Sequence, residues 1–230
     1  MTPLHATCLC DTVAWEVTAP LEMMHHCHCS RCRKAHGTGF ATFAMCAASG
    51  VRVTRGRDEI TTYESSPGVP RAFCRRCGSV APSDAVWNGQ VGIPVGPLEG
   101  DPGERPMAHI FAASKAPWLE IAGDLPRFEA YPPGVDAAVQ PDLARSGGAG
   151  GPPRGSCLCG AVAFVVTGEP LRCQHCHCMR CRRARAAAHA SNFFTAIGGV
   201  RFTAGEDRLR TYKLPEARFF TQAFCTTCGS

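Results

Sequence analysis

The residues best suited to chemistry in this 230-residue chain are cysteines in a short, dense stretch that occurs twice. The first occurrence is Cys27-His28-Cys29-Ser30-Arg31-Cys32, and the second is Cys176-His177-Cys178-Met179-Arg180-Cys181. Three thiols within six residues are too close for independent disulfides, whereas converging thiolates suit a soft or borderline metal such as zinc. Three protein ligands leave a fourth position open for water or substrate. The stretch therefore predicts a zinc–thiolate site, present twice.

The recurrence extends beyond these stretches at a constant offset. Cys157 follows Cys8 by 149 residues, and Tyr212 follows Tyr63 by the same number. After the tyrosine the offset becomes 151 residues. A constant offset across unrelated residue types predicts a tandem duplication.

The repeat sets the expected domain boundaries. We expect a first zinc domain over residues 1–133 and a second copy over residues 154–230. Between them, residues 134–153 are rich in proline, glycine and small side chains and predict a flexible linker. The second copy has nothing that matches Val80–Tyr131, so part of its core should be missing. We expect it to be a fragment or to borrow strands from elsewhere.

Each copy carries seven cysteines, which divide into a closed four-cysteine site and an open three-cysteine site. The outer pairs suit the closed site because they would join the start of the unit to its far strand. In the first copy these pairs are Cys8, Cys10, Cys74 and Cys77, and in the second copy they are Cys157, Cys159, Cys225 and Cys228. Spacing alone leaves a rival division, in which Cys29 and Cys32 form a knuckle of the structural site. It also leaves an all-structural alternative, with two zinc ions per copy and no chemistry.

The elements that must position these cysteines are short strands. Val13, Trp15 and Val17 alternate with other residues, which indicates a half-buried strand. Further strands are expected over 41–45, 51–54, 60–63 and 91–95, the last at a sheet edge because of Pro94. Apolar pieces at 109–111 and 118–121 would close a core. No segment has a long helical period, so the predicted class is mainly β.

Composition narrows the class of protein. The net charge is +5 and is spread along the chain without a polybasic block, so nucleic-acid binding is not indicated. We find no secretory signal, and the longest apolar runs are too short to span a membrane. The sixteen cysteines therefore predict reduced, metal-bound thiols in the cytoplasm. A disulfide framework in a secreted protein is the alternative.

Other residues near the cysteines have weaker signals. Cys46 and Cys173 have no counterpart in the other copy and are expected to be ordinary small apolar residues. His28 and His177 lie between the thiols, where they could donate hydrogen bonds in support of metal ligands. Five cations could receive an anionic substrate or could balance charge in a solvated shell. They are Arg31, Arg33, Lys34, Arg75 and Arg76.

The order of the motifs resembles one known family. Cys-Leu-Cys at 8–10, the cluster at 27–35 and Phe-Cys-x-x-Cys-Gly-Ser at 73–79 resemble the glutathione-dependent formaldehyde-activating enzymes, also called the centromere protein V/formaldehyde-activating domain. The first copy is similar over residues 4–131, and the second over residues 155–230.

The resemblance implies an Mss4-like zinc-binding β fold with a structural and a second, catalytic zinc ion in each copy. It implies that Cys27, Cys29 and Cys32 hold the catalytic metal, as Cys176, Cys178 and Cys181 would in the second copy, and that the outer pairs hold the structural metal. The implied activity is that of a carbon–sulfur lyase that joins glutathione, the co-substrate, to formaldehyde or acts on a related thiol and aldehyde.

The second copy departs from the pattern where His36-Gly37-Thr38-Gly39 is replaced by Arg185-Ala186-Ala187-Ala188. We therefore expect the first copy to carry the activity. Two other functions compete with the lyase: a non-catalytic zinc module that binds a small thiol or a protein partner, and a chromatin-type nucleic-acid binder. The absence of a basic tail disfavours the last.

Overall fold

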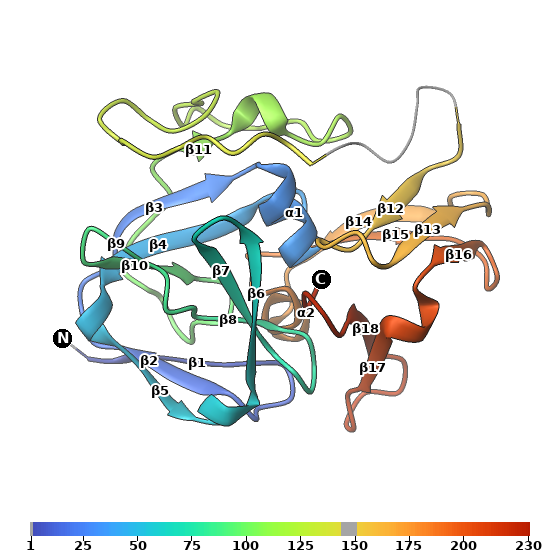
Figure 1. The fold of residues 1–230 in the computed structure, drawn as a ribbon, viewed down its shortest axis with the longest axis horizontal. Helices are drawn as coiled ribbons and strands as arrows, with labels where there is room; N and C mark the ends of the chain where they lie inside the picture. Colours follow the sequence, from blue (N-terminus) through green and yellow to red (C-terminus); the bar gives the residue numbers. More distant parts are fainter. Residues whose placement is uncertain (1, 144–150) are drawn as a thin grey trace.

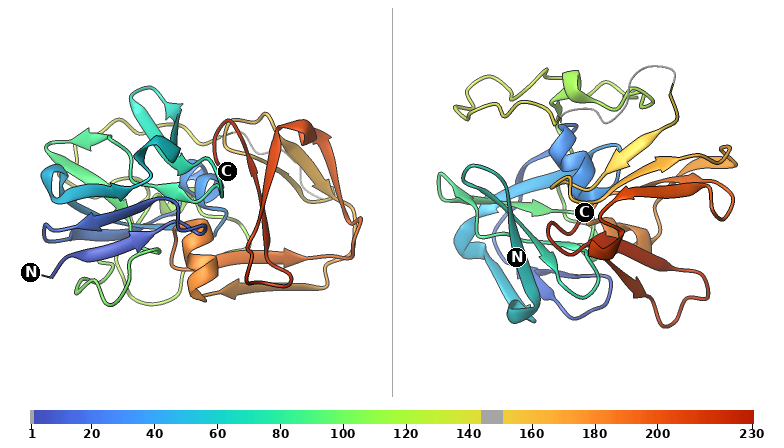
Figure 2. Two further views of the ribbon diagram at one scale, coloured as in Figure 1. Left: turned by 90° about the horizontal axis from the view of Figure 1, so that it is seen from below. Right: turned by 45° about the vertical axis from the view of Figure 1, so that its right-hand side comes forward.

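The structure is a computed structural model in which residues 2–143 and 151–230 are described. It is mainly β, which confirms the predicted class (Figure 1). We call residues 2–133 the first unit and residues 154–230 the second unit. The two lie side by side, as Figure 2 shows. Among the described residues, no helix has the length and apolar character needed to cross a bilayer.

The first unit contains three sheets. One pairs its strands in the order β1 (Leu4–Thr7), β2 (Ala14–Val17), β5 (Val51–Arg55). The largest has the order β11 (His109–Ile110), β3 (Glu22–Cys27), β4 (Ala41–Ala47), β10 (Gln90–Pro94), β9 (Val86–Trp87). The third has the order β6 (Ile60–Ser66), β7 (Val69–Cys74), β8 (Val80–Ala81). Three 3₁₀ turns complete the unit, at Ala48–Gly50, Arg57–Glu59 and Ala112–Ser114.

The core of the first unit follows the predicted alternation. Val13, Trp15 and Val17 are all buried and pack with Ile93 of β10 and Cys46 of β4. The apolar face of β2 therefore meets the large sheet, and burial of these side chains supplies the main hydrophobic stabilisation of this unit.

Two details of the expected strands need correction. β10 is not simply an edge strand: it pairs with β4 along its length and with β9 at Gln90 and Val91. Pro94 lies beyond the β9 pairing, so its missing N–H disrupts no ladder there. Trp118 does not close a core, because it is 61% exposed.

The sequence prediction missed two short helices, α1 (Ser30–His36) and α2 (Met179–Arg185). Each begins directly after the middle cysteine of its triple stretch and lasts seven residues. A helix of two turns is too short to show the 3.6-residue period by which helices are recognised. α1 is fixed by local caps instead: the Cys29 sulfur accepts the Cys32 N–H, and Gly37 adopts a left-handed conformation.

The second unit repeats the order of strands and α-helix of the first from β1 to β7. One sheet has the order β12 (Arg154–Ser156), β13 (Ala163–Val166), β16 (Val200–Ala204). A second pairs β14 (Arg172–Cys176) with β15 (Ala190–Phe194). A third pairs β17 (Leu209–Lys213) with β18 (Thr221–Cys225). A 3₁₀ turn at Glu206–Arg208 precedes β17. Ala186, the counterpart of Gly37, has φ of 46° and keeps the left-handed end of the helix. The bend is therefore retained although the glycine is replaced. The origin of the units by duplication stays a prediction.

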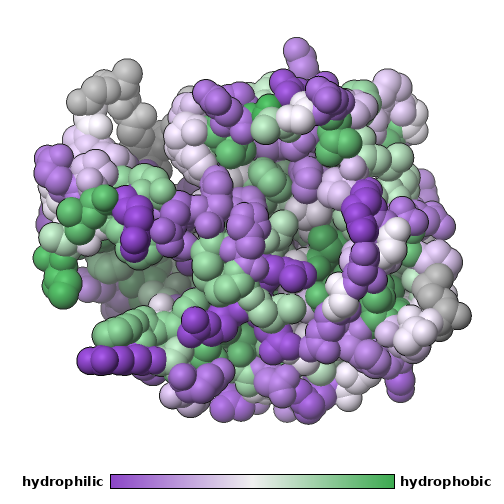
Figure 3. Space-filling view, turned by 180° about the vertical axis from the view of Figure 1, so that it is seen from behind, coloured by the Kyte–Doolittle hydropathy of each residue, from purple (hydrophilic) through white to green (hydrophobic). Residues whose placement is uncertain are grey.

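The β14–β15 pair lacks the neighbours that its counterpart has in the first unit. There β10 and β11 flank β3–β4, whereas among residues 151–230 no strand pairs with the outer edges of β14 and β15. Apolar side chains are left exposed as a result, including Leu171 at 70% and Phe193 at 44%. Figure 3 shows hydrophobic residues at the surface on the side of the second unit.

The expected linker is described at both ends, while residues 144–150 lie outside the described residues. Its N-terminal part makes hydrogen bonds with the first unit. Asp142 accepts the backbone N–H of Ser30 at 3.2 Å, and the N–H of Leu143 donates to the Ser30 hydroxyl at 2.8 Å. This stretch therefore lies against the first turn of α1.

Equivalent residues of the two units meet at their interface. The rings of Phe73 and Phe224 lie 6.5 Å apart, centroid to centroid. Gly78 faces Phe224, and Gly229 faces Phe73. In each case a Cβ on the glycine would lie 2.4 Å from the ring. Both glycines have positive φ, so the contact needs glycine for its backbone conformation and for the space.

A second part of the interface is built from histidines. Phe40 packs at an angle against His26, with ring centroids 4.5 Å apart, and edge-to-face against His189 of the second unit at 5.0 Å. His189 lies 4.5 Å from His175 and shares a 2.9 Å hydrogen bond with the Thr38 hydroxyl. These residues form a continuous layer of rings across the two units.

This layer predicts a pH-dependent interface. Burial lowers the pKa of His189 from 6.5 to about 4, with a smaller contribution from the charges of His175 and His177. The unfolded chain therefore binds the proton more readily than the folded chain. The contribution of neutral His189 to the free energy of unfolding should be fully present above about pH 6.5 and should decrease as the pH falls toward 4. We expect His189→Phe to weaken the decrease in unfolding free energy between pH 7 and pH 5, measured by urea titration. Parallel pH dependences in the two proteins would contradict this assignment.

Candidate metal centres

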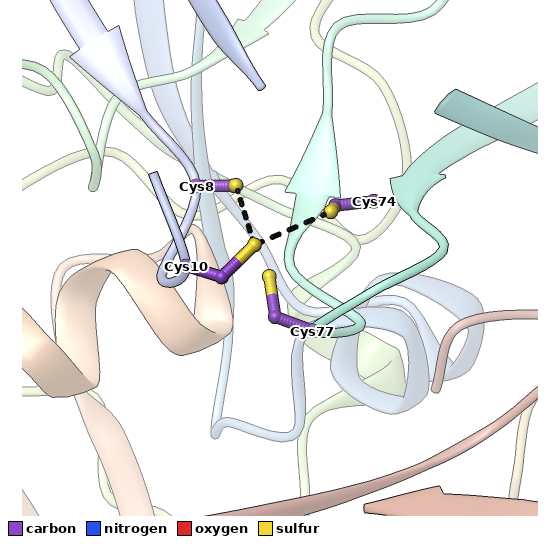
Figure 4. A group of neighbouring side chains, drawn as sticks. All are labelled: Cys8, Cys10, Cys74 and Cys77. Carbon is purple, nitrogen blue, oxygen red and sulfur yellow. Dashed lines mark hydrogen bonds between the residues drawn. The ribbon is translucent and has the colours of Figure 1, made fainter. Parts of the chain in front are cut away.

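The first four-cysteine group joins the start of the first unit to its third sheet (Figure 4). Cys8 and Cys10 lie in the turn after β1, and Cys74 and Cys77 lie at the end of β7 and in the turn that follows. All four sulfurs lie within 4.8 Å of one another. The Cys10 sulfur is 3.5 Å from that of Cys8 and 3.7 Å from that of Cys74.

These distances fit a zinc ion. Sulfurs bound tetrahedrally at about 2.3 Å from zinc lie roughly 3.8 Å apart. The backbone N–H of Val13 donates to the Cys8 sulfur at 3.3 Å, and the Cys77 thiol contacts the Ser79 hydroxyl at 3.3 Å. Such contacts orient ligand sulfurs and reduce the charge on them. Hydrogen bonds from Cys74, Cys77 and Cys8 hold the pKa of Cys10 well below its usual range.

The second four-cysteine group has the same geometry. The sulfurs of Cys157, Cys159, Cys225 and Cys228 lie within 4.8 Å of one another. Cys159 is 3.4 Å from Cys157 and 3.8 Å from Cys225, and the N–H of Val162 donates to Cys157 at 3.3 Å.

The first three-cysteine group lies where β3 meets α1. Cys27 ends β3 and Cys29 precedes α1, and both lie with Cys32 in a group whose sulfurs are within 4.8 Å. Cys27 and Cys32 are buried, and Cys29 is half-buried. The parallel strand β11 covers them, with Ile110 opposite Cys27 and the rings of Phe111 and Tyr131 packed nearby. The three cysteines thus lie in a cluster of mostly apolar side chains.

The grouping bears on the rival division of the cysteines. Cys29 and Cys32 lie with Cys27 and not with the four-cysteine group. The described geometry therefore favours the division in which the outer pairs form one group. Metal occupancy and the catalytic role of the triple group stay predictions.

Arg71 on β7 is a residue that the sequence analysis missed. Its guanidinium donates to the Cys32 sulfur at 3.4 Å and to the Ser65 hydroxyl at 3.0 Å. Three thiolates on a zinc ion leave one net negative charge, and a cation within hydrogen-bonding distance would balance it in this apolar setting. Arg71 is replaced at the equivalent position by Gln222, a charge difference that comparison of the two halves could have revealed.

The second three-cysteine group has a different environment. The sulfurs of Cys176, Cys178 and Cys181 lie within 4.8 Å of one another, with Cys176 and Cys178 3.6 Å apart. Cys178 is exposed, since no counterpart of β11 covers it among the described residues. Gln222 donates to the carbonyl of Ala184. The group therefore lacks the apolar cover of the first one. A different arginine serves it, since the Arg180 side chain hydrogen-bonds to Cys178.

The lone cysteines and the histidines differ in their placement. Cys46 is buried in the core, whereas Cys173 is exposed and lies in none of the four groups. All sixteen cysteines are free thiols. His28 is buried and shares a 2.9 Å hydrogen bond with His109, so it supports β11 rather than a cysteine sulfur through that nitrogen.

The cations named in the sequence analysis all contact protein groups. Arg31 donates to the carbonyl of Ser65. Arg33 donates to those of His28 and Ser114. Lys34 donates to the second unit.

The two remaining cations lie between Cys74 and Cys77 in sequence. Arg75 pairs with Glu59, and Arg76 donates to the Thr12 hydroxyl.

An open hollow of about 200 Å³ lies near α1, at the boundary between the units. It is lined by Arg33, Lys34, Gly37, Thr38, Trp118 and Ser191. The two cations and the exposed indole give it a positively charged and partly apolar character. It could receive an anionic group.

Comparison with known proteins places these features in a family. The family model described as "Glutathione-dependent formaldehyde-activating enzyme" matches residues 3–114 and 152–230. Two curated relatives, from Talaromyces marneffei and Pyrenophora teres f. teres, are each named "Putative glutathione-dependent formaldehyde-activating enzyme". Each is 32% identical over 73 residues, or 31% of this chain. The chain spans 39% and 38% of their respective lengths.

A crystal structure of a Rhodobacter sphaeroides protein is also similar, with 29% identity and a TM-score of 0.36. The match covers 42% of this chain and 89% of that protein.

The fold and the cysteine groups define a mainly β protein with candidate zinc–thiolate centres. Within that class, the chain belongs to the glutathione-dependent formaldehyde-activating enzyme family, because the family model matches most of its residues. The resemblance drawn from the cysteine motifs is thereby confirmed.

Arg71 generates a prediction about metal retention. Arg71→Gln gives the first unit the residue found at position 222 and removes the charge beside Cys32. We expect zinc to leave the first three-cysteine group roughly tenfold faster, since a buried negative charge loses its partner. Transfer to a chromogenic chelator measures the rate, and native mass spectrometry counts the ions retained.

Arg71→Lys is the matched variant that keeps the charge, and it should restore part of the retention. Unchanged zinc release in Arg71→Gln would show that the guanidinium does not stabilise the group.

Proposed function

We propose that this protein is a zinc-dependent carbon–sulfur lyase that combines glutathione with formaldehyde, or a related thiol with an aldehyde. The observation that carries the proposal is the first three-cysteine group, whose sulfurs lie together under β11 and beside Arg71. The family description and the names of the relatives support the substrate pair. Free thiols throughout the chain agree with a reducing compartment, and we propose the cytoplasm.

The reaction joins two small molecules without an oxidant. The sulfur of glutathione adds to the carbonyl carbon of formaldehyde, a C–S bond forms, and the C=O bond becomes a C–O single bond. The proton of the thiol is transferred to that oxygen, which gives S-hydroxymethylglutathione. Cys27, Cys29 and Cys32 would hold a zinc ion, which when bound lowers the pKa of a nearby thiol so that the nucleophilic thiolate is present near neutral pH.

The chain's own residues would contribute position and charge. Phe111 and Tyr131 limit access of water to the cysteines. Arg71 would balance the negative charge of the thiolates. Arg33 and Lys34, which line the hollow near α1, could attract the carboxylates of glutathione. We propose that the first unit carries the activity, because the second three-cysteine group is more exposed and has Gln222 where the first has Arg71.

A non-catalytic role is the second candidate, and the second unit favours it. Cys178 is exposed and no strand equivalent to β11 covers it among the described residues, so this half could serve as a zinc module that binds a small thiol or a protein partner.

Exchange spectroscopy by NMR on labelled formaldehyde and glutathione tests the proposal. We expect zinc-loaded protein to accelerate exchange between free and adduct forms. Cys29→Ser should reduce this acceleration on the order of a hundredfold or more, because it removes a ligand of the metal. Cys173→Ser, which changes a cysteine outside the four groups, is the matched control and should behave as wild type.

Exchange no faster than in the uncatalysed mixture would remove this substrate pair. Loss of exchange in Cys29→Ser is informative only if the variant keeps the far-UV circular dichroism of the wild type, which is measured alongside.

A further inference from the structure

The first three-cysteine group depends on the position of a helix that is too short to be stable alone. α1 (Ser30–His36) carries Cys32 and is preceded by Cys29. Isolated helices of this length are marginal in water, so tertiary contacts must hold it. Its N-terminal end receives such contacts from the linker, where Asp142 accepts the Ser30 N–H.

The C-terminal end of α1 is held by the second unit. The Ser230 hydroxyl donates to the carbonyl of Lys34 at 2.7 Å. That carbonyl belongs to the last turn, where helix carbonyls have no partner within the helix. The Lys34 ammonium donates to the Ser156 hydroxyl and to the carbonyl of Cys157, and the His36 ring contacts the carbonyl of Arg185 at 2.8 Å. Four contacts from the second unit thus fix one turn.

Ala35 lies on the second four-cysteine group itself. It packs against the cluster formed by Cys157, Leu158, Val162, Cys225 and Cys228. Four sulfurs drawn together by a metal would give a rigid surface for this side of the helix. If the group comes apart, the hydrogen bonds of Ser156, Cys157 and Ser230 lose their position with it, because Cys157 belongs to the group and the two serines lie within two residues of its cysteines.

The arrangement is reciprocal. Ala184 of α2 packs in the core of the first unit with Cys8 and Cys77. Arg183 pairs with Glu99 of the first unit at 2.6 Å. Figure 4 shows α2 as the pale orange helix beside Cys10. Each short helix therefore rests on the four-cysteine group of the other unit.

We infer that the second unit is a positioning element: its four-cysteine group holds α1, and through α1 it fixes Cys29 and Cys32 of the first unit. This assigns the second unit a role that does not need its own exposed three-cysteine group to act. The inference concerns the position of the first three-cysteine group and does not depend on the substrate of the proposed lyase.

Hydrogen exchange of the full chain, read by mass spectrometry with zinc present, tests the inference. Cys228→Ser removes one sulfur from the second four-cysteine group. We expect the amides of Arg33–His36 to exchange about tenfold faster in this variant, while β2 and β10 of the first unit keep their protection. Alkylation of Cys32 by iodoacetamide should accelerate in parallel. Cys173→Ser is the matched control and should change neither readout.

Two further variants leave every cysteine in place. Lys34→Met removes the ammonium contacts with the second unit, and Ser230→Ala removes the helix cap. Each should speed exchange of the α1 amides about fivefold, since a single hydrogen bond contributes about 1 kcal/mol. These variants decide the matter if Cys228→Ser unfolds the whole chain.

Unchanged protection of α1 in Cys228→Ser, with β18 exposed to exchange, would overturn the inference. So would wild-type protection in both Lys34→Met and Ser230→Ala. The readouts separate this inference from the proposed function, because exchange of α1 does not require turnover. A chain that fails to accelerate glutathione–formaldehyde exchange but loses α1 protection in Cys228→Ser refutes the activity alone.

Discussion

In each of the two units, the structure depends on holding four cysteine sulfurs close enough together to bind one metal ion. Thiolates in such proximity repel one another unless a cation or shared protons compensate, so the chain must surround each group with support. Backbone N–H groups such as that of Val13 donate hydrogen bonds to the sulfurs. The tight turn after Cys77 is made possible by Gly78, which has positive φ. The sheets of each unit connect the two cysteine pairs of the group.

The two units share the surroundings of the four-cysteine group but differ in those of the three-cysteine group. The four-cysteine groups are alike in spacing, in burial and in the N–H that supports the first sulfur. The three-cysteine groups diverge: one lies under β11 beside Arg71, and the other is open to solvent with Gln222 in place of the cation. This difference agrees with the proposal that the four-cysteine groups support the fold and that the first three-cysteine group carries the chemistry.

Much of this could be predicted from the sequence because cysteine spacing and strand alternation are local signals. The mainly β class and the buried face with Trp15 follow from such patterns. The short helices did not, because two turns show no period and their caps involve a cysteine sulfur and contacts from distant residues. Arg71 was also missed, since its proximity to Cys32 arises from packing of β7 against α1 across 39 residues of sequence. The sequence pattern likewise gave no sign that Lys34 and Ala35 would face another unit.

The reciprocal contact between each knuckle glycine and the other unit's phenylalanine limits how the chain can evolve. A side chain at Gly78 would be strained by the positive φ and would also need Phe224 to make room, and the same holds for Gly229 and Phe73. Changes at these positions must therefore be accepted in pairs that lie 146 and 156 residues apart in sequence. A gene that encodes both units on one chain passes such paired changes on together, whereas two separate genes would have to acquire them independently.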